Sequence, residues 1–263
     1  MSTIIVALLL QLFSDGMPPP AVANVLPRPA HPIMADEEFL YEVSWTVFKI
    51  GTIRIKTIAP GEARAWIDSY DGIPFVDLHS VYHCVMDSLL FSRGASTVDK
   101  VNEAWEGFRY TPEEGSSRVF IDRIAVSDPV HPPARTERLD TITLPQHQFV
   151  DGLTIGYLPR AFIHTNRTLE VITVLNGKTG TTTFEFTGRH MDVAIDALER
   201  PVKVVEVRGS TSATGIFGMS GEFTGWFSDD EAGVPIKGEV KVLLGNVTVE
   251  LIQWRRDGWQ PPT

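Results

Sequence analysis

The sequence has almost no cysteine. Cys84 is the single cysteine among 263 residues, which excludes an internal disulfide and any zinc site built from several thiolates. A chain of this kind suits export through an oxidising compartment, although the count does not require export. We therefore expect no metal centre.

Clusters of basic residues are also missing. The chain carries 23 Lys and Arg against 33 Asp and Glu, a formal net charge of -10 and a pI near 5.2. Nucleic-acid binding starts from a basic face that neutralises phosphates, so the composition predicts no nucleic-acid partner.

No apolar run is long enough to span a bilayer, which takes about 20 residues. The run Ile4–Phe13 has instead the length of a signal-peptide h-region, and Ala21–Ala23 offers a small-x-small cleavage site. No Lys or Arg precedes the run, so a disordered cytosolic leader and a misplaced start codon remain alternatives. Residues 1–23 are predicted to be a signal peptide, which implies export to the periplasm or cell envelope. We expect no integral membrane span in the mature chain.

Proline marks the next segment. Residues 17–36 contain Pro18, Pro19, Pro20, Pro27, Pro29 and Pro32, a density that favours extended, polyproline-like backbone. Residues 24–36 are predicted to be a linker, 37–254 a single β domain and 255–263 a C-terminal tail. At this length one large β domain suffices.

The hydrophobic period beyond the linker is two. In Phe39–Val47 the odd positions are apolar and the alternate side chains mostly polar, as a half-buried strand requires. Gly51 interrupts the pattern and Thr52–Lys56 resumes it. The range Trp45–Ile58 is therefore predicted to form a hairpin.

Two further hairpins are indicated by their turn residues. Asn176–Gly177 lies within Leu169–Phe186 and suits a type I′ turn, since both residues tolerate positive φ. Gly245–Asn246 lies within Val240–Leu251 and suits a type II′ turn. The only helical candidates are weak and cover Ala95–Trp105 and Val150–Phe162. The fold class predicted is mostly β: a single antiparallel, strongly curved or barrel-like sheet with at most one or two short helices.

Three consecutive carboxylates, Asp229, Asp230 and Glu231, follow Trp226. Catalytic carboxylate pairs converge across a cleft in environments that separate their pKa values, whereas three adjacent acids on a loop are solvated. Asp, Ser, Gly and Pro are also turn formers. We predict that Ser228–Pro235 is the connection between two strands.

The pair His79 and His83 raises the question of a metal site beside Cys84. On a strand these histidines lie roughly 13 Å apart, too far to share an ion. The alternation of residues 76–86 predicts a strand, with Cys84 as a small buried hydrophobe. No Gly-x-Ser-x-Gly elbow occurs. We therefore assign no catalytic residue, no metal ligand and no cofactor.

Four segments, in order, resemble the bacterial exported family catalogued as domain of unknown function 3108. They are the strand pair Leu40–Gly51; Phe149–Arg160, similar to that family's Asp-x-Leu and Tyr-x-x-Arg segment; Asn176–Gly177 followed by Gly188–Arg189; and Trp226–Ile236, similar to its Trp-x-x-x-Asp strand pair. The chain departs from the pattern around Gly152 and at Pro159. The resemblance covers roughly Glu37 to Trp254 and implies an exported, mostly β envelope protein with no established activity.

Three function classes follow. The first is a non-enzymatic binding module for an apolar or envelope-derived ligand, with a lipid, a glycan or an envelope protein as partner. Aromatic side chains would supply its contact area: Trp45, Trp66, Trp105, Trp226, Phe108 and Phe149. The alternatives are a hydrolase or isomerase with an unrecognised site, whose first suspects are Asp151, Tyr157, Arg160 and Asp230, and a structural or assembly protein of the envelope. Our candidate ligand-binding residues are Asp151, Tyr157, Arg160, Trp226 and Asp230.

Overall fold

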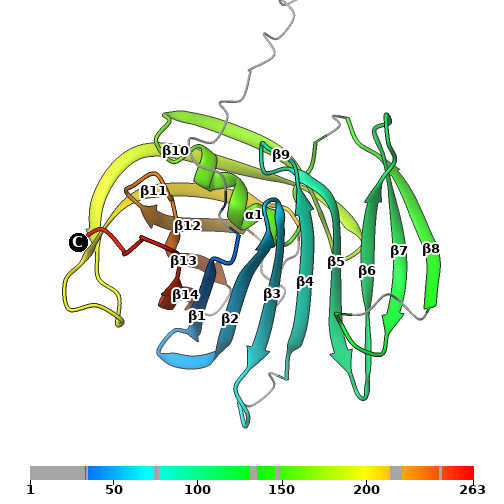
Figure 1. The fold of residues 1–263 in the computed structure, drawn as a ribbon, viewed down its shortest axis with the longest axis horizontal. Coiled ribbons are helices and arrows are strands. Elements are labelled where there is room, and N and C mark those ends of the chain that lie inside the picture. Colours follow the sequence, from blue (N-terminus) through cyan, green and yellow to red (C-terminus); the bar gives the residue numbers. More distant parts are fainter. Residues whose placement is uncertain are drawn as a thin grey trace, which may run out of the picture.

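The fold is a long antiparallel meander. The computed structural model describes residues 33, 35–73, 77–130, 135–145, 148–213, 221–242 and 245–263. Within them, one 14-stranded sheet runs in the order β8-β7-β6-β5-β4-β3-β2-β1-β14-β13-β12-β11-β10-β9 (Figure 1). Every neighbour in the sheet is also a neighbour in sequence except β1 and β14, which join the first half of the chain to the second. This leaves β8 and β9 at the two edges.

The elements have the following bounds: β1 Glu38–Trp45, β2 Phe48–Ala59, β3 Glu62–Ser69, β4 His79–Met86, β5 Ser92–Val101, β6 Ala104–Pro112, β7 Arg118–Val126, β8 Arg135–Thr143, α1 Thr154–Tyr157, η1 Leu158–Ala161, β9 Arg167–Leu175, β10 Lys178–Val193, β11 Val202–Thr211, β12 Gly221–Ser228, β13 Pro235–Val242 and β14 Gly245–Arg255. No helix in the described part of the chain is long and apolar enough to cross a bilayer.

The sheet curls strongly, so that β9, β10 and β11 arch over its concave side (Figure 1). The tip of the β9–β10 hairpin reaches β6, where the Gly177 amide donates to the Tyr110 hydroxyl at 3.0 Å. Close to this tip, Val150 forms a parallel bridge with Thr173 of β9. The prediction of a single antiparallel, strongly curved sheet with at most two short helices is confirmed.

The Asn176–Gly177 hairpin is confirmed. Both residues have positive φ, 50° and 72°, and they join the paired strands β9 and β10. The predicted connection Ser228–Pro235 also joins two paired strands, β12 and β13.

The other two predicted hairpins are also present, as the pairs β1–β2 and β13–β14, but their glycines lie inside strands. β1 ends at Trp45 and β2 begins at Phe48, so the turn precedes Gly51, which lies inside β2. A Cβ at Gly51 would stand 2.3 Å from the carbonyl oxygen of Asp68; the glycine permits close strand approach rather than a turn. Gly245 and Asn246 begin β14 and pair with β13; residues 243–244 lie outside the described residues.

One helical candidate was right and the other wrong. Val150–Phe162 contains α1 and η1, while Ala95–Trp105 forms the β5–β6 hairpin. The apolar residues Ala95, Val98, Val101 and Ala104 are spaced three apart, which is also compatible with one face of a helix. In the sheet they divide between faces, because Ala95 packs in the main core and Val98 in a separate cluster on the other side.

The main core fills the concave side of the sheet. It includes Tyr82, Tyr110, Phe149, Phe162, Phe184 and Phe186, together with Cys84, which is fully buried. Burial raises the pKa of the Cys84 thiol well above its ordinary value, so the thiol stays protonated and packs as a small apolar group, as the sequence predicted.

The histidines of β4 lie apart, each paired with a carboxylate of β3. His79 Nδ1 is 2.8 Å from Asp68 Oδ1, and His83 Nε2 is 2.9 Å from Glu62 Oε1. Among the described residues, no group of three or more His, Cys, Asp or Glu side chains is placed to hold a metal ion.

Candidate ligand-binding site

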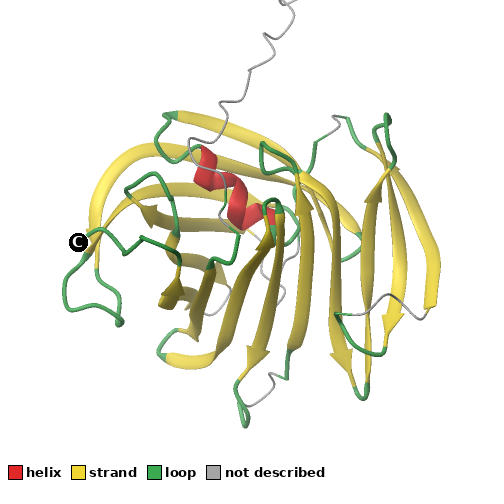
Figure 2. Cartoon of the chain, viewed as in Figure 1, coloured by secondary structure: helices red, strands yellow, loops and turns green. Residues whose placement is uncertain are grey.

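The helical segment α1–η1 lies within the concavity of the sheet (Figure 2). Asp151 fixes its start, since one carboxylate oxygen accepts from the amides of Leu153 and Thr154 at 2.8 and 3.0 Å. In return, the Thr154 hydroxyl accepts from the Asp151 amide at 2.7 Å. This reciprocal cap satisfies backbone donors at the beginning of the helix. Burial raises the pKa of the Asp151 carboxyl above its ordinary value.

Two adjoining cavities lie between this helical segment and the sheet. The first has a volume of about 190 Å³ and is bordered by β1, β2, β12, β13 and β14. The second, of about 270 Å³, extends towards β9, β10 and β11. Both are lined by Gly156, Gly225, Phe227, Gly238 and Val249, so the two cavities lie side by side, and they are called here the first and the second lobe of the site. Its aromatic lining comes from Phe39, Tyr41, Tyr157, Phe184, Phe223 and Phe227.

Glycines leave this space open. Gly225 and Gly238 are register partners on β12 and β13, and Gly156 faces the space from α1. A Cβ on Gly156 would meet nothing within 4 Å, and one on Gly238 would meet only the Thr224 carbonyl oxygen, at 3.9 Å. Larger side chains at either position would therefore occupy the space itself.

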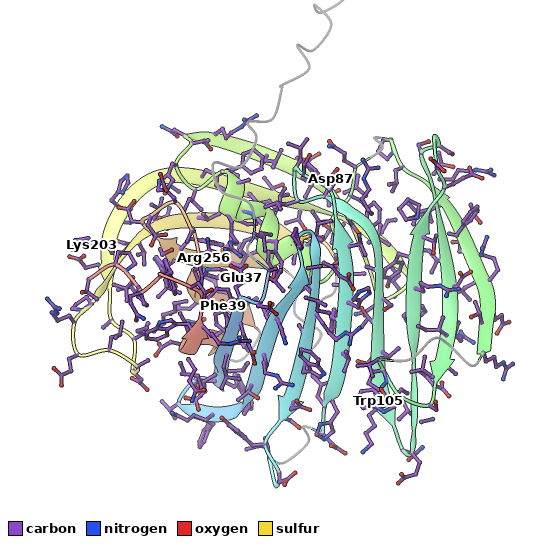
Figure 3. All side chains as sticks on the ribbon, in the orientation of Figure 1. Glu37, Phe39, Asp87, Trp105, Lys203 and Arg256 are labelled. Carbon is purple, nitrogen blue, oxygen red and sulfur yellow. The ribbon has the colours of Figure 1, made fainter. Side chains whose placement is uncertain are left out.

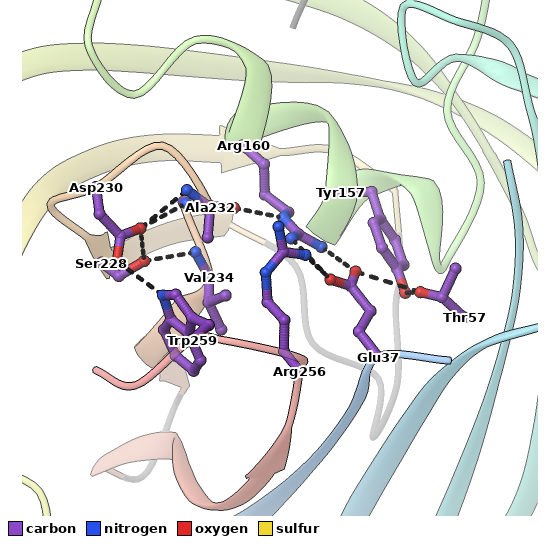
Figure 4. A network of polar contacts seen from close by, with 11 residues as sticks. Glu37, Thr57, Tyr157, Arg160, Ser228, Asp230, Ala232, Val234, Arg256 and Trp259 are labelled. Carbon is purple, nitrogen blue, oxygen red and sulfur yellow. Dashed lines mark hydrogen bonds and ion pairs between the residues drawn. The ribbon is translucent and has the colours of Figure 1, made fainter. Parts of the chain in front are cut away.

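A buried cluster of charges borders the first lobe (Figure 4). The side chain of Glu37 is 0% exposed, and those of Arg160 and Arg256 are 6% and 7% exposed. Arg160 donates to both Glu37 oxygens, at 2.6 and 3.2 Å, and its Nε donates to the Ala232 carbonyl at 3.1 Å. Arg256 also donates to Glu37. Figure 3 places Glu37, Phe39 and Arg256 together near the middle of the molecule.

Hydroxyl groups extend this cluster. Thr57 donates to Glu37 at 3.3 Å, and its oxygen lies 3.0 Å from the Tyr157 hydroxyl. The Tyr41 hydroxyl donates to the Pro235 carbonyl at 3.1 Å. Burial raises the pKa of both tyrosines above their ordinary value, more than the nearby Arg160 charge lowers it. Both phenols are therefore neutral at physiological pH.

Asp230 organises the loop that packs against η1. Its Oδ1 accepts from the Ser228 hydroxyl and from the amides of Ala232 and Gly233, at 2.8, 2.9 and 3.1 Å. Its Oδ2 accepts from the Trp259 indole at 2.8 Å, and Trp259 packs edge-on against Phe39. The carboxylate thus joins the β12–β13 loop to the chain after β14.

The structure brings three of the five candidate residues together. Tyr157 and Arg160 line the first lobe, and Asp230 shapes the loop whose Ala232 carbonyl accepts from Arg160. Asp151 is a buried cap. Trp226 is half-buried beside a second apolar cluster and lines neither lobe.

Sequence reasoning missed the partners of Arg160. Glu37 lies at the expected domain boundary and Arg256 in the expected C-terminal tail. No sequence pattern therefore marked either residue as a partner of Arg160. The six aromatics proposed for ligand contact do not line the two lobes. For example, Trp66 and Trp105 pack in a separate apolar cluster with Val81, Val98, Ile124 and Val126, and Trp105 appears at the lower end of the sheet in Figure 3.

Comparison with known proteins identifies the fold. No family model matches the chain, and no curated protein matches its sequence. A crystal structure from Brucella abortus, described as a β-barrel-like protein of domain of unknown function DUF1849, aligns with a TM-score of 0.55 and 9% identity, over 85% of this chain and 98% of that chain. The two chains share a fold. At this identity the likeness extends to the β-barrel-like architecture alone.

Proposed function

We propose that this protein is a non-enzymatic binding module that holds an apolar ligand between the helical segment and the sheet. The two-lobed apolar space is the observation that carries the proposal. Each lobe far exceeds the roughly 10–15 Å³ that one water molecule needs, and its lining is almost wholly apolar. Ligand pockets in proteins have this character, with a few polar groups that fix orientation.

The placement of the polar candidates supports binding over catalysis. An active site needs convergent groups around a reacting atom. Asp151 is instead engaged in capping α1, and Asp230 in holding its loop. Only Tyr157 and Arg160 among the suspects border the space, and Arg160 is paired with Glu37.

The experiment uses a neutral apolar fluorophore, N-phenyl-1-naphthylamine, whose emission rises when it leaves water. We expect saturable binding to the purified protein and loss of binding in Gly238→Leu, because the new side chain fills the space. The matched control is Gly94→Leu, also on a strand. A Cβ there meets only the Tyr110 carbonyl oxygen, at 3.7 Å, and Gly94 does not border the two lobes.

Thermal melts establish that each variant is folded. If Gly238→Leu does not fold, Gly156→Leu makes the same test from the helical side. The proposal is wrong if the wild-type protein does not bind the fluorophore, or if the folded cavity-filling variant binds it as the control does.

Export to the periplasm or cell envelope is a further part of the proposal. It is supported by the apolar run Ile4–Phe13 and by Ala21–Ala23, and by the sequence resemblance to the exported family of domain of unknown function 3108. Fractionation with N-terminal sequencing should find a mature protein beginning near Asn24 in the envelope fraction. Recovery of the intact Met1 chain from cytosol alone would contradict export.

A further inference from the structure

The cluster that borders the first lobe is not charge-balanced. It contains two guanidinium groups and one carboxylate, all with side chains at most 7% exposed. Among the described residues, Glu37 is the acidic partner of both arginines. The tyrosine and threonine hydroxyls around it are neutral. One carboxylate is therefore shared by two guanidinium groups beside an apolar space.

A buried charge without a partner is costly, whereas one that meets an opposite charge with good hydrogen-bond geometry is tolerated. Arg160 is the member of the cluster that borders the lobe. Of its five N–H donors, three are used, two by Glu37 and one by the Ala232 carbonyl. Glu37 also accepts from Arg256, so it keeps a cationic partner when Arg160 turns towards another anion.

Lys237 is the other cation on the lining, and it is already neutralised. Its Nζ lies 2.8 Å from the Glu250 carboxylate. The charge available at the lobe is thus that of Arg160, at the end where Tyr41 and Tyr157 also lie. The rest of the lining of the two lobes is mainly apolar.

We propose that the ligand is a single-chain amphipathic carboxylate, with its head group on Arg160 and its hydrocarbon chain in the two lobes. A carboxylate matches the planar fork of a guanidinium and brings the cluster to two positive and two negative charges. This inference rests on the proposed function, because it names the class of ligand that the apolar space takes.

The experiment compares three probes by calorimetry: dodecanoate, dodecanol and butyrate. Dodecanoate should bind at least about tenfold more tightly than dodecanol, since a hydrogen bond between two charged groups is roughly twice as strong as one between neutral groups. Butyrate should bind far more weakly, because it lacks the chain. Equal binding of dodecanoate and dodecanol overturns the head-group assignment and leaves the proposed function standing. Failure of both dodecyl probes overturns the proposed function itself.

Variants test whether the cluster of Glu37, Arg160 and Arg256 causes the preference for dodecanoate over dodecanol. Arg160→Met leaves Glu37 paired with Arg256 and should remove the preference for dodecanoate over dodecanol. Arg255→Met is the matched control, because Arg255 is an exposed arginine that lines neither lobe and pairs with Glu38; this variant should retain the preference. Glu37→Gln raises the excess charge and should increase the preference, together with the thermal stabilisation that dodecanoate gives.

These variants also separate a binding role from a structural one. Retention of the preference in folded Arg160→Met, or its loss in Arg255→Met, would overturn the assignment. If Arg160→Met does not fold, the Glu37→Gln result decides, and an unchanged or smaller preference there contradicts the proposal. Should neither cluster variant fold, the wild-type comparison of dodecanoate with dodecanol decides.

Discussion

Replacing Asp230 by alanine should destabilise the protein far more than replacing either acidic neighbour. The carboxylate accepts four hydrogen bonds, from Ser228, Ala232, Gly233 and Trp259. The Gly233 amide also reaches the Asp230 carbonyl, so it keeps an acceptor. Alanine therefore leaves the buried Ser228 hydroxyl, the Ala232 amide and the Trp259 indole without the acceptor that Asp230 supplies.

Each donor left unpaired in a buried setting costs about 1–3 kcal/mol, so we expect Asp230→Ala to lower the free energy of unfolding by about 3 kcal/mol. For a domain of this size that corresponds to a fall of roughly 6–12 °C in Tm. The Trp259 fluorescence should also change, because the indole loses its acceptor.

Asp229→Ala and Glu231→Ala are the matched controls for this measurement. Asp229 pairs with His190 and His164, which are 60% and 48% exposed, and exposed ion pairs contribute about 0–1 kcal/mol. Glu231 is exposed. Urea melts of the three variants give the comparison. The reasoning is refuted if Asp230→Ala stays within about 0.5 kcal/mol of wild type, the usual range for surface sites, or if a control proves equally damaging.

Three other predictions follow from buried groups. In urea melts, Glu37→Gln should lower the free energy of unfolding by about 3–5 kcal/mol, because two buried guanidinium groups lose their anionic partner. Arg160→Met should lower it by less, because the Glu37–Arg256 pair remains. The opposite order would contradict this reasoning. Burial raises the pKa of Tyr110 to about 12 and raises those of Tyr41, Tyr82 and Tyr157 as well. The folded state then holds these protons more tightly than the unfolded state. The stabilisation that results should be fully present below about pH 10 and should be lost as the pH rises above it. Absorbance at 295 nm should show these four phenols ionising only when the protein unfolds. Cys84 should resist Ellman's reagent in the native protein and react in urea, since its thiol is buried and protonated; rapid labelling of the native protein would show that the core opens.

The sequence alone determined the class of fold and some of its turns. Alternation of apolar and polar side chains over Phe39–Trp45 is a local property, because side chains of a strand point to opposite faces whatever the strand pairs with. Asn176–Gly177 likewise carries its turn in its own backbone preferences, and both residues adopt positive φ. A glycine is a poor guide to a turn where it is needed for close strand packing. Gly51 is such a case, because it lies against the Asp68 carbonyl of the neighbouring strand.

Only the tertiary structure decided where the site lies. Glu37, Arg160 and Arg256 meet across separations of more than one hundred residues, 123 between Glu37 and Arg160 and 219 between Glu37 and Arg256, and no local pattern encodes that meeting. The pairing of β1 with β14 brings the two ends of the domain together, and the curl of the sheet encloses the helical segment. Hydrophobic period sets which face of a strand is buried, but the register and curvature of the whole sheet set which buried side chains face a cavity.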